Sequence, residues 1–408
     1  MDITIMPSKL SGKLSIPASK SCAHRALICA ALADGKSVIS GVSMSKDIEA
    51  TIASMTALGA EFEVNGSEII VNGITSPSEK AVIDCCESGS TLRFVIPIAA
   101  ALGTDAEFIG RGRLPQRPIN IFIRELGSKG VNFLTETMPY KTTGKLCGGT
   151  YSIEGDVSSQ FVTGLLFALP LLEEDSEIVL TSHLESRPYV DITVDMLRKY
   201  GIVVEESESF YRIKGGQKYT PHDEKIEGDY SQAAFFFVAN ALGSDVELEN
   251  LNVESVQGDK RILDIISQTS SNGSIGSFRA DCSDIPDLVP ILAVLAAFGS
   301  GESVIYNAQR LRIKESDRLE TTAAMLNNLG GDVQVKADGL IIRPTGKMHG
   351  GTVESFGDHR IVMAAAIAAT AVDGEVVIKG AEAVEKSYPD FINDYKMLGG
   401  TADVIILE

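Results

Sequence analysis

Residues 17–40 read PASKSCAHRALICAALADGKSVIS, in which a small polar turn opens a long apolar segment that stops at Gly35 and enters a β-branched run. The same order of features recurs six times, and the copies begin near Ser19, Ser88, Ser158, Ser231, Asp284 and Asp358. Their spacing of roughly 50–75 residues is typical of an internal repeat. Each copy predicts a polar turn at a helix N-terminus, where backbone N–H groups favour anions. The six turns therefore predict a cage of anion-binding groups.

A second, amphipathic helix follows in most copies and stops at a glycine. Apolar residues recur at helical spacing in residues 47–58, 118–126, 190–200, 315–329 and 389–398, which run into Gly59, Gly127, Gly201, Gly330 and Gly399. The fourth copy, around residues 259–267, is weaker and lacks the Leu-Gly stop. The repeated unit therefore reads β-α-β-α-β-β, which indicates an α/β fold.

The chain length of 408 residues suits about two domains, so six units divide into two sets of three. The break is predicted near Gly228, which makes residues 19–227 an N-terminal domain of repeats 1–3. The strand at residues 2–6 precedes the first full repeat, and we expect it to pair with the C-terminal domain. That domain, of repeats 4–6, is therefore discontinuous and takes residues 1–18 and 228–408. A cleft between the two domains is the expected ligand site.

The composition excludes several classes of partner. A net charge of −19 disfavours nucleic acid and anionic membranes, because both need a basic surface. No apolar stretch approaches the roughly 18 residues that span a bilayer. The N-terminus shows no signal-peptide pattern, so a cytoplasmic location is expected. The six cysteines form no C-x-x-C pair and no zinc-like spacing, so no metal site is predicted.

Basic residues gather at the repeat turns of both halves. They are Lys20, Arg25, Arg117, Lys314, Arg318, Arg360 and Lys386. Capping, a solvated loop or a salt-bridged surface helix would explain several of these turns singly. Lys314 and Arg318, four residues apart, are expected on one helix face. So much positive charge predicts one or two ligands with several anionic groups, and Asp287 and Glu315 could then transfer protons in a dry site.

Nine motifs in this order resemble the 5-enolpyruvylshikimate-3-phosphate synthase (EPSP synthase) family over essentially the whole chain. They are ASKSCAHR, ESGSTLR, LPQRPI, GDVSSQF, SRPYVDIT, IPDL, RIKESDR, GDHR and EKSYPD. The resemblance implies two inverse α/β domains, each of three repeats, which is the enolpyruvyl transferase fold. It implies a cytoplasmic, usually monomeric enzyme that uses no metal and no organic cofactor.

The resemblance also implies the reaction and the substrate-binding residues. The family transfers the enolpyruvyl group of phosphoenolpyruvate to the 5-hydroxyl of shikimate 3-phosphate, on the route to chorismate and the aromatic amino acids. Shikimate 3-phosphate would be held by Ser21, Arg25, Ser158, Ser159, Gln160, Ser186, Tyr189, Asp287 and Lys314. Phosphoenolpyruvate would be held by Lys20, Gly89, Arg117, Gln160, Arg318, Arg360 and Lys386.

The chemistry needs a base for the 5-hydroxyl and an acid for the methylene carbon. By motif position, Asp287 is expected to be the base, and Glu315 with Lys20 the proton donor. Two residues depart from the family pattern: Glu87 stands where many relatives have Asn, and Arg310 where many have a neutral side chain. The herbicide glyphosate occupies the phosphoenolpyruvate site in this family, and Gly89 is the small residue associated with sensitivity.

Three other functions were weighed. The sister family that transfers enolpyruvyl to UDP-N-acetylglucosamine carries a reactive Cys in the loop that corresponds to residues 112–118, and this loop has none. A non-catalytic phosphate-sugar binding protein would not need Asp287 and Glu315 beside bound anions. A repeat scaffold would expose a long concave surface rather than converging basic turns.

Overall fold

The computed structural model describes residues 1–271 and 273–405. The chain forms two compact units: unit 1 combines Met1–Pro17 with Gly228–Glu408, and unit 2 is Ala18–Glu227. Ala18 therefore lies in unit 2, one residue before the predicted boundary. Each unit has its own hydrophobic core. Within the described residues, no helix combines the length and the apolar character that a membrane crossing requires.

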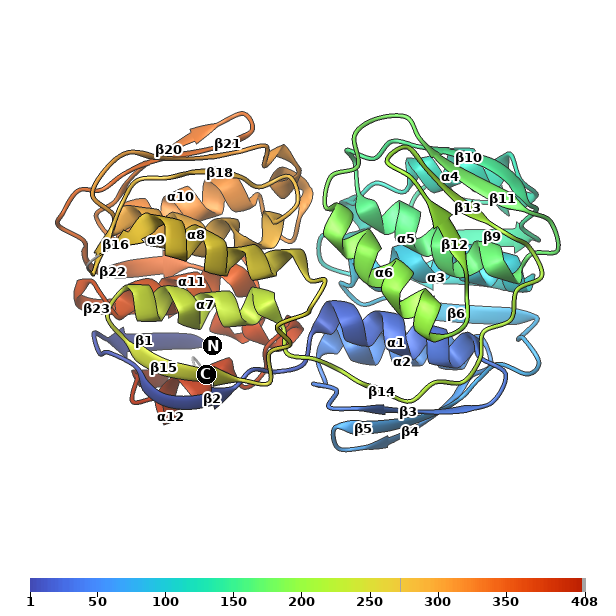
Figure 1. The fold of residues 1–408 in the computed structure, drawn as a ribbon, viewed down its shortest axis with the longest axis horizontal. Helices are drawn as coiled ribbons and strands as arrows, with labels where there is room; N and C mark the ends of the chain where they lie inside the picture. The colour runs from blue at the N-terminus through green and yellow to red at the C-terminus, as the bar shows by residue number, and fades with distance from the viewer. Residues whose placement is uncertain (272, 406–408) are drawn as a thin grey trace. The chain divides into compact units, whose positions relative to one another are not determined.

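Unit 2 contains three four-stranded sheets that share one strand order. Figure 1 labels strands of each of these sheets on the ribbon. In each sheet the first strand of a repeat runs parallel to the second, and the fourth strand lies antiparallel between the second and the third. One sheet orders β6 (Lys80–Asp84), β7 (Asp105–Ile109), β9 (Tyr140–Gly144) and β8 (Val131–Phe133). Another orders β10 (Gly149–Ile153), β11 (Ser176–Leu180), β13 (Phe210–Ile213) and β12 (Val204–Glu206). These sheets confirm the β-α-β-α-β-β unit.

The remaining sheet of unit 2 takes its first strand from the far end of the unit. This short strand, β14 (Glu224–Lys225), pairs in parallel with β3 (Lys36–Ser40). β5 (Glu68–Asn72) then joins β3 to β4 (Glu61–Asn65). No strand was predicted at residues 224–225, because two residues are too few to show an alternating pattern.

Unit 1 contains two sheets of the same order and one incomplete copy. The complete sheets are β18 (Arg279–Asp281), β19 (Ser303–Tyr306), β21 (Gly339–Arg343) and β20 (Asp332–Lys336), and β22 (His349–Glu354), β23 (Asp373–Lys379), β1 (Asp2–Met6) and β24 (Thr401–Ile405). Ile3 on β1 lies opposite Ile378 and Val404, which confirms that the N-terminal strand pairs with the C-terminal part.

The fourth repeat is the incomplete copy, in agreement with its weak sequence signal. β2 (Ser11–Ser15) pairs in parallel with β15 (Asp245–Glu249). The hairpin of β16 (Ser270–Ser271) and β17 (Ser274–Ile275) forms a separate two-stranded sheet.

The first helix of each repeat is buried because it is apolar on nearly every side. These helices are α1 (Lys20–Leu32), α3 (Gly89–Leu102) and α5 (Ser159–Ala168) in unit 2, and α7 (Tyr230–Ala241), α9 (Val289–Ala297) and α11 (His359–Ala369) in unit 1. Every residue of α9 and α11 is buried. Each fully buried Leu or Ile stabilises the fold by about 1.5–3 kcal/mol. The core therefore fixes where these helices begin, and with them the polar turns.

The second helices are amphipathic and pack with one face on the core. They are α2 (Lys46–Ala57), α4 (Asn120–Gly127), α6 (Arg187–Lys199), α8 (Ile262–Thr269), α10 (Arg318–Asn328) and α12 (Phe391–Met397). Glycines with positive φ follow most of them, as at Gly59 and Gly201. The stop predicted at Gly127 is wrong, because this residue is the last of α4 and the positive φ falls at Gly130.

Side-chain caps begin five of the six buried helices. Ser19, Ser88, Ser158, Asp229 and Asp358 each accept a hydrogen bond from a backbone N–H of the first turn. The fourth turn is therefore capped at Asp229 rather than at Ser231. The fifth begins with a 3₁₀ turn, Pro286–Leu288, so Asp284 is not its cap.

Candidate functional site

Arg25 brings three of the predicted ligand-binding residues of unit 2 together. Its Nη1 donates to the carbonyl oxygen of Ser21 at 2.7 Å, and its Nη2 donates to that of Tyr189 at 2.6 Å. The Tyr189 amide in turn donates to the carbonyl of Ser186, which caps α6 in a left-handed conformation with φ 57°. The turns that open α1 and α6 are therefore joined through one guanidinium group.

The charge of Arg25 is buried beside neutral groups. Its third hydrogen bond goes from Nε to Thr193 Oγ1 at 2.8 Å, and its guanidinium carbon lies 5.4 Å from the centre of the Phe94 ring. The residue is only 3% exposed, and among the described residues no carboxylate pairs with it. Burial lowers the pKa of Arg25 to about 10. Because a buried charge is costly unless it is paired, this arrangement favours an anionic ligand.

A second group of contacts in unit 2 centres on Gln160. Its side-chain oxygen accepts from Arg93 Nη1 at 2.9 Å, and its side-chain nitrogen donates to Ser90 Oγ at 3.0 Å. Gln160 follows Ser158, which caps α5, and the buried Ser159. The start of α5 is thereby tied to the start of α3. Arg93 was quoted in the family motif but not predicted as a site residue.

Arg117 lies directly against Gly89. A Cβ atom placed on Gly89 would be 2.3 Å from Arg117 Nη1 and 2.5 Å from its Cζ. The glycine is the third residue of the ESGSTLR motif and the first of α3, so its lack of a side chain is what admits the guanidinium group to the start of α3. A second close pair stands nearby in sequence, where Glu87 lies against Gly112, whose Cβ would meet the carboxylate at 2.7 Å.

Lys20, the first residue of α1, forms an ion pair with Asp47 of α2. The distance from Lys20 Nζ to Asp47 Oδ2 is 2.9 Å, and the two side chains are 22% and 15% exposed. The carboxylate offsets the unfavourable placement of a cation at a helix N-terminus. Asp47 was not predicted as a partner of Lys20, although Asp47 lies in the first turn of the second helix of the same repeat.

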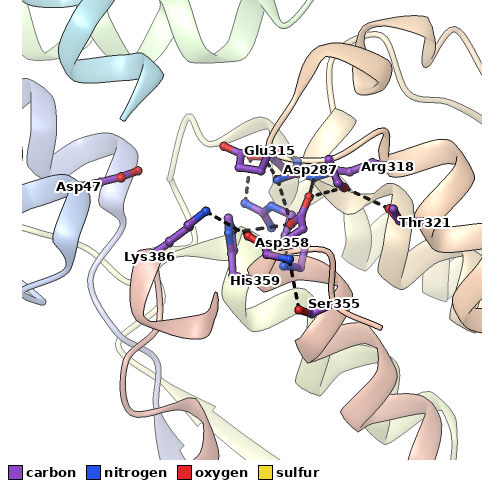
Figure 2. A network of polar contacts seen from close by, with 12 residues as sticks. Asp47, Asp287, Glu315, Arg318, Thr321, Ser355, Asp358, His359 and Lys386 are labelled. Carbon is purple, nitrogen blue, oxygen red and sulfur yellow. Dashed lines mark hydrogen bonds and ion pairs between the residues drawn. The ribbon is translucent and has the colours of Figure 1, made fainter. Parts of the chain in front are cut away.

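The site residues of unit 1 meet around Arg318, which is 2% exposed in its side chain (Figure 2). Arg318 donates to Asp287 Oδ1, Glu315 Oε2 and Asp358 Oδ2, each at 2.8 Å. Asp358 also accepts from Ser316 Oγ at 3.0 Å and caps α11. One guanidinium group therefore holds the IPDL, RIKESDR and GDHR motifs together. The sequence predicts Asp358 only as the start of a helix. Its ion pair with Arg318 was not predicted.

Asp287 lies between two arginines. Its Oδ1 accepts from Arg318 at 2.8 Å and its Oδ2 accepts from Arg360 Nη2 at 2.9 Å. Burial alone would raise the pKa of Asp287, but the positive charges of Arg360, Lys314 and Arg318 outweigh it and hold the pKa well below 3.8. The carboxylate is therefore ionised in the free protein.

Lys314 and Arg318 do not share a helix face, so that expectation is wrong. Lys314 follows a 3₁₀ turn, Gln309–Ile313, in an extended conformation, and α10 begins only at Arg318. Asp317 caps α10 through its side chain and thereby breaks the helix that the sequence extended back to Glu315. Burial and, more weakly, Arg318 lower the pKa of Lys314 to about 8, against the opposing effect of Asp287.

Lys386, Arg310 and Asp259 make further polar contacts in unit 1. Lys386 Nζ donates to the carbonyl of Gly357, in the GDHR turn, at 3.0 Å. Arg310 Nη2 donates to the carbonyl of Ser283 at 3.2 Å. Asp259, which the sequence reading missed, is 4% exposed and accepts a hydrogen bond from Ser231. Burial and then the Asp287 carboxylate raise the pKa of Asp259 to about 7.

Each unit thus carries most of its predicted site residues in the first turns of its helices or in the 3₁₀ turns and bends beside them. Unit 2 presents Lys20, Arg25 and Arg117 among hydroxyl, amide and backbone groups. Unit 1 presents Lys314, Arg318, Arg360 and Lys386 with the carboxylates of Asp287 and Glu315. Cations bind phosphate and carboxylate groups. Carboxylates beside them add the capacity for proton transfer.

Comparisons with known proteins identify the family and the fold of the chain. Residues 5–395 match the family model described as EPSP synthase (3-phosphoshikimate 1-carboxyvinyltransferase). A 3-phosphoshikimate 1-carboxyvinyltransferase of Clostridium perfringens is 45% identical over 98% of both chains, and one of Clostridioides difficile is 41% identical over 98% of both.

Solved structures with the same fold include the EPSP synthase of Acinetobacter baumannii. It is 26% identical to this chain, with a TM-score of 0.84 over 98% of this chain and 99% of that one. The enolpyruvyl transferase NikO of Streptomyces tendae, 16% identical, shares the fold with a TM-score of 0.80 over 98% of both chains. The fold class predicted from the sequence is therefore confirmed, and the chain belongs to the EPSP synthase (3-phosphoshikimate 1-carboxyvinyltransferase) family.

Proposed function

We propose that this chain transfers the enolpyruvyl group of phosphoenolpyruvate to the 5-hydroxyl of shikimate 3-phosphate, with release of phosphate. The product is the precursor of chorismate and the aromatic amino acids. The reaction is an addition followed by an elimination and needs no metal or organic cofactor. The family resemblance supports a monomer that works in the cytoplasm, with these two small molecules as its partners.

Shikimate 3-phosphate is assigned to residues of both units. In unit 2 these are Ser21, Arg25, Ser158, Ser159, Gln160, Ser186 and Tyr189, and in unit 1 they are Asp287 and Lys314. The assignment to Arg25 is supported by its buried charge, which has only neutral oxygen atoms around it. A phosphate group would supply the missing negative charge.

Phosphoenolpyruvate is assigned to Lys20, Gly89, Arg117 and Gln160 in unit 2 and to Arg318, Arg360 and Lys386 in unit 1. Its carboxylate and phosphate groups both suit the planar donors of arginine. The support is strongest for Arg117, because Gly89 leaves its guanidinium group room at the start of α3.

Ligand binding would release Asp287 for its role as the base. Arg318 and Arg360 hold this carboxylate in its ionised form, which makes it a weak base in the free protein. An anion that takes hydrogen bonds from either arginine weakens that hold and raises the pKa of Asp287 towards a useful range. Glu315, which accepts a hydrogen bond from Arg318 at 2.8 Å, would donate the proton to the methylene carbon together with Lys20.

The observation that carries the enzymatic proposal is the ionised Asp287 between two arginines. A protein that only bound anions would gain nothing from a carboxylate there, because it repels the ligand. The test is phosphate release from phosphoenolpyruvate with shikimate 3-phosphate, with UDP-N-acetylglucosamine, and with neither acceptor. Release that depends on shikimate 3-phosphate is expected. Folded protein that binds shikimate 3-phosphate and releases no phosphate with it would instead support a binding protein.

Replacing Gly89 by alanine is expected to weaken phosphoenolpyruvate binding about 10-fold or more, the effect of losing one charged hydrogen bond. The new methyl group would occupy the place of the Arg117 guanidinium group, whose nearest atom is 2.3 Å away. Isothermal titration of phosphoenolpyruvate without shikimate 3-phosphate, where no turnover can occur, measures the change in affinity. Gly127→Ala is the matched control, because nothing lies within 4 Å of its added Cβ. Equal affinities in the two variants would refute the placement of Arg117.

The affinity for shikimate 3-phosphate is expected to fall as pH rises through about 8. Lys314 has a pKa lowered to about 8, so its ammonium group is present below that pH and lost above it. If the ammonium group binds the ligand, Kd rises by up to about tenfold between pH 8 and pH 9. Titrations of shikimate 3-phosphate into the protein at pH 7, 8 and 9 measure this change in Kd. Lys314→Arg stays charged throughout and should remove the dependence; an equal dependence in this variant would assign it to another group.

A further inference from the structure

Arg93 of α3 is buried beside the first turn of α5, which carries Gln160. The residue is 2% exposed, and no substrate was assigned to it above. Its Nη2 donates to the carbonyl of Pro118 at 2.9 Å, and its guanidinium carbon lies 5.3 Å from the centre of the Phe161 ring. Its Nη1 donates to Gln160 Oε1 at 2.9 Å. The carbonyl and the ring therefore hold the guanidinium group in place against the Gln160 side chain.

The contact with Arg93 decides which way the Gln160 amide faces. Arginine has only donors, so the amide atom beside it must be the oxygen. The amide nitrogen then lies at the other end, where it donates to Ser90 Oγ at 3.0 Å. The Ser90 hydroxyl could equally well accept from the nitrogen or donate to the oxygen, so it selects neither orientation. Of these two neighbours, only Arg93 distinguishes the two ends of the amide.

The nitrogen end of the amide lies beside a predicted anion-binding group. Arg117 lies against Gly89, the neighbour of Ser90, so a cation and an amide donor meet at the start of α3. Ser90, Arg117 and Gln160 are all partly exposed to solvent. The nitrogen carries two hydrogens, and in residues 1–271 and 273–405 only Ser90 accepts one of them. An anion is attracted by the second hydrogen, whereas a reversed amide would present its oxygen and repel the anion.

We propose that Arg93 is a positioning residue that holds the Gln160 amide with its N–H group towards a phosphate or carboxylate oxygen bound beside Arg117. Arg93 acts through Gln160 and does not itself touch the ligand. The identity of the ligand, phosphoenolpyruvate, rests on the proposed function. The orientation of the amide does not.

A double-mutant cycle tests whether Arg93 acts through Gln160. Arg93→Met and Gln160→Met each remove the polar end of a long side chain. Each should raise Kd for phosphoenolpyruvate and for inorganic phosphate, titrated without shikimate 3-phosphate, about 10- to 100-fold, the effect of one hydrogen bond to an anion. The double variant should bind within about threefold of Gln160→Met, because no amide is left to position. Effects that multiply in the double variant would show that Arg93 acts by another route and would overturn the proposal.

Arg212→Met is the matched control for the loss of positive charge. Arg212 also lies over an aromatic ring, with its guanidinium carbon 4.2 Å from the centre of Phe210, and it pairs with Glu177 at 2.7 Å. Its side chain is 53% exposed on a sheet of the same unit, so the substitution should change neither Kd. Equal effects of Arg93→Met and Arg212→Met would assign the loss to net charge and refute positioning.

Gln160→Glu leaves Arg93 in place and guards against a misfolded Arg93→Met. Its carboxylate still gives Arg93 an oxygen, but it puts a second oxygen where the amide nitrogen was. Both dissociation constants should rise at least as much as in Gln160→Met, because the new oxygen repels the anion. Affinities within about threefold of the parent in folded Gln160→Glu would contradict the orientation of the amide.

The hold of Arg93 on the amide is measured without any ligand. In ¹H–¹⁵N spectra of labelled protein, the side-chain amide pair that is lost in Gln160→Met belongs to Gln160. Arg93→Met should move this pair towards the shifts of a free glutamine side chain. A pair that stays in place would disprove the proposal even in an active enzyme. A pair that moves in a protein without transferase activity would sink only the proposed function.

Discussion

Replacing Asp287 by asparagine is expected to lower kcat by about 10²- to 10⁴-fold, the range that general acid–base catalysis contributes. The amide cannot take a proton from the 5-hydroxyl, yet its oxygen can still accept from Arg318 or Arg360. The KM for each substrate should therefore change far less than kcat, because the ligand-binding cations stay in place. Steady-state kinetics with both substrates at pH 7 measure kcat and each KM separately.

The matched control for this substitution is Asp332→Asn. Asp332 is an exposed residue at the start of β20 and pairs with Arg343 at 3.9 Å, so the same chemical change there should leave kcat unaltered. A kcat in Asp287→Asn within about threefold of the parent would assign the base to another residue. A large rise in KM with kcat preserved would make Asp287 a binding group instead.

Replacing Arg318 by methionine is expected to destabilise unit 1 by about 3–5 kcal/mol, as the loss of one partner from a buried ion pair does. Three carboxylates, Asp287, Glu315 and Asp358, would lose the cation that lies 2.8 Å from each. Because the chain has no tryptophan, hydrogen exchange of the α11 amides is the suitable local measurement of this loss. Phosphoenolpyruvate binding should be lost as well.

The pH dependence of this loss has a definite sign. Arg318 is one of the charges that lower the pKa of Asp287, so the stability it confers is present above the unfolded pKa of about 3.9 and is lost as pH falls towards the folded pKa. The difference in the free energy of unfolding between Arg318→Met and the parent protein should therefore become smaller below about pH 4. Arg312→Met is the control: Arg312 is 31% exposed and pairs with Asp317, so its loss should cost less than about 1 kcal/mol. Equal effects of the two substitutions would contradict a special role for Arg318.

The sequence predicted the parts of this protein that depend on periodic pattern. The buried helices were recognisable because an apolar run such as residues 361–372 carries its own signal, and α11 spans His359–Ala369. The sequence also indicated that the fourth copy is weak. In the structure this copy is incomplete, and its hairpin forms a separate two-stranded sheet. Many predicted residues of the candidate site could be located from the motifs, because residues such as Lys20, Gly89 and Arg360 lie at helix starts that the core fixes.

What the sequence could not supply was the partner of each charged residue. Lys314 and Arg318 fit a common helix on spacing alone, and only the cap formed by Asp317 separates them. Asp358 looked like a helix start, yet it also accepts from Arg318, which is 40 residues away in sequence. Likewise, β14 has two residues and no pattern, so its pairing with β3 follows from tertiary structure.

The strands contributed by distant segments set an order of assembly during synthesis. Unit 2 completes its first sheet only when β14 has been made, at residues 224–225, but it can then fold before any of the remaining C-terminal segment exists. β1, by contrast, leaves the ribosome first and finds its neighbours, β23 and β24, last. For most of translation that strand has unpaired edges, which are prone to wrong pairing. The nascent chain therefore carries an unpaired β1 until β23 and β24 have been synthesised.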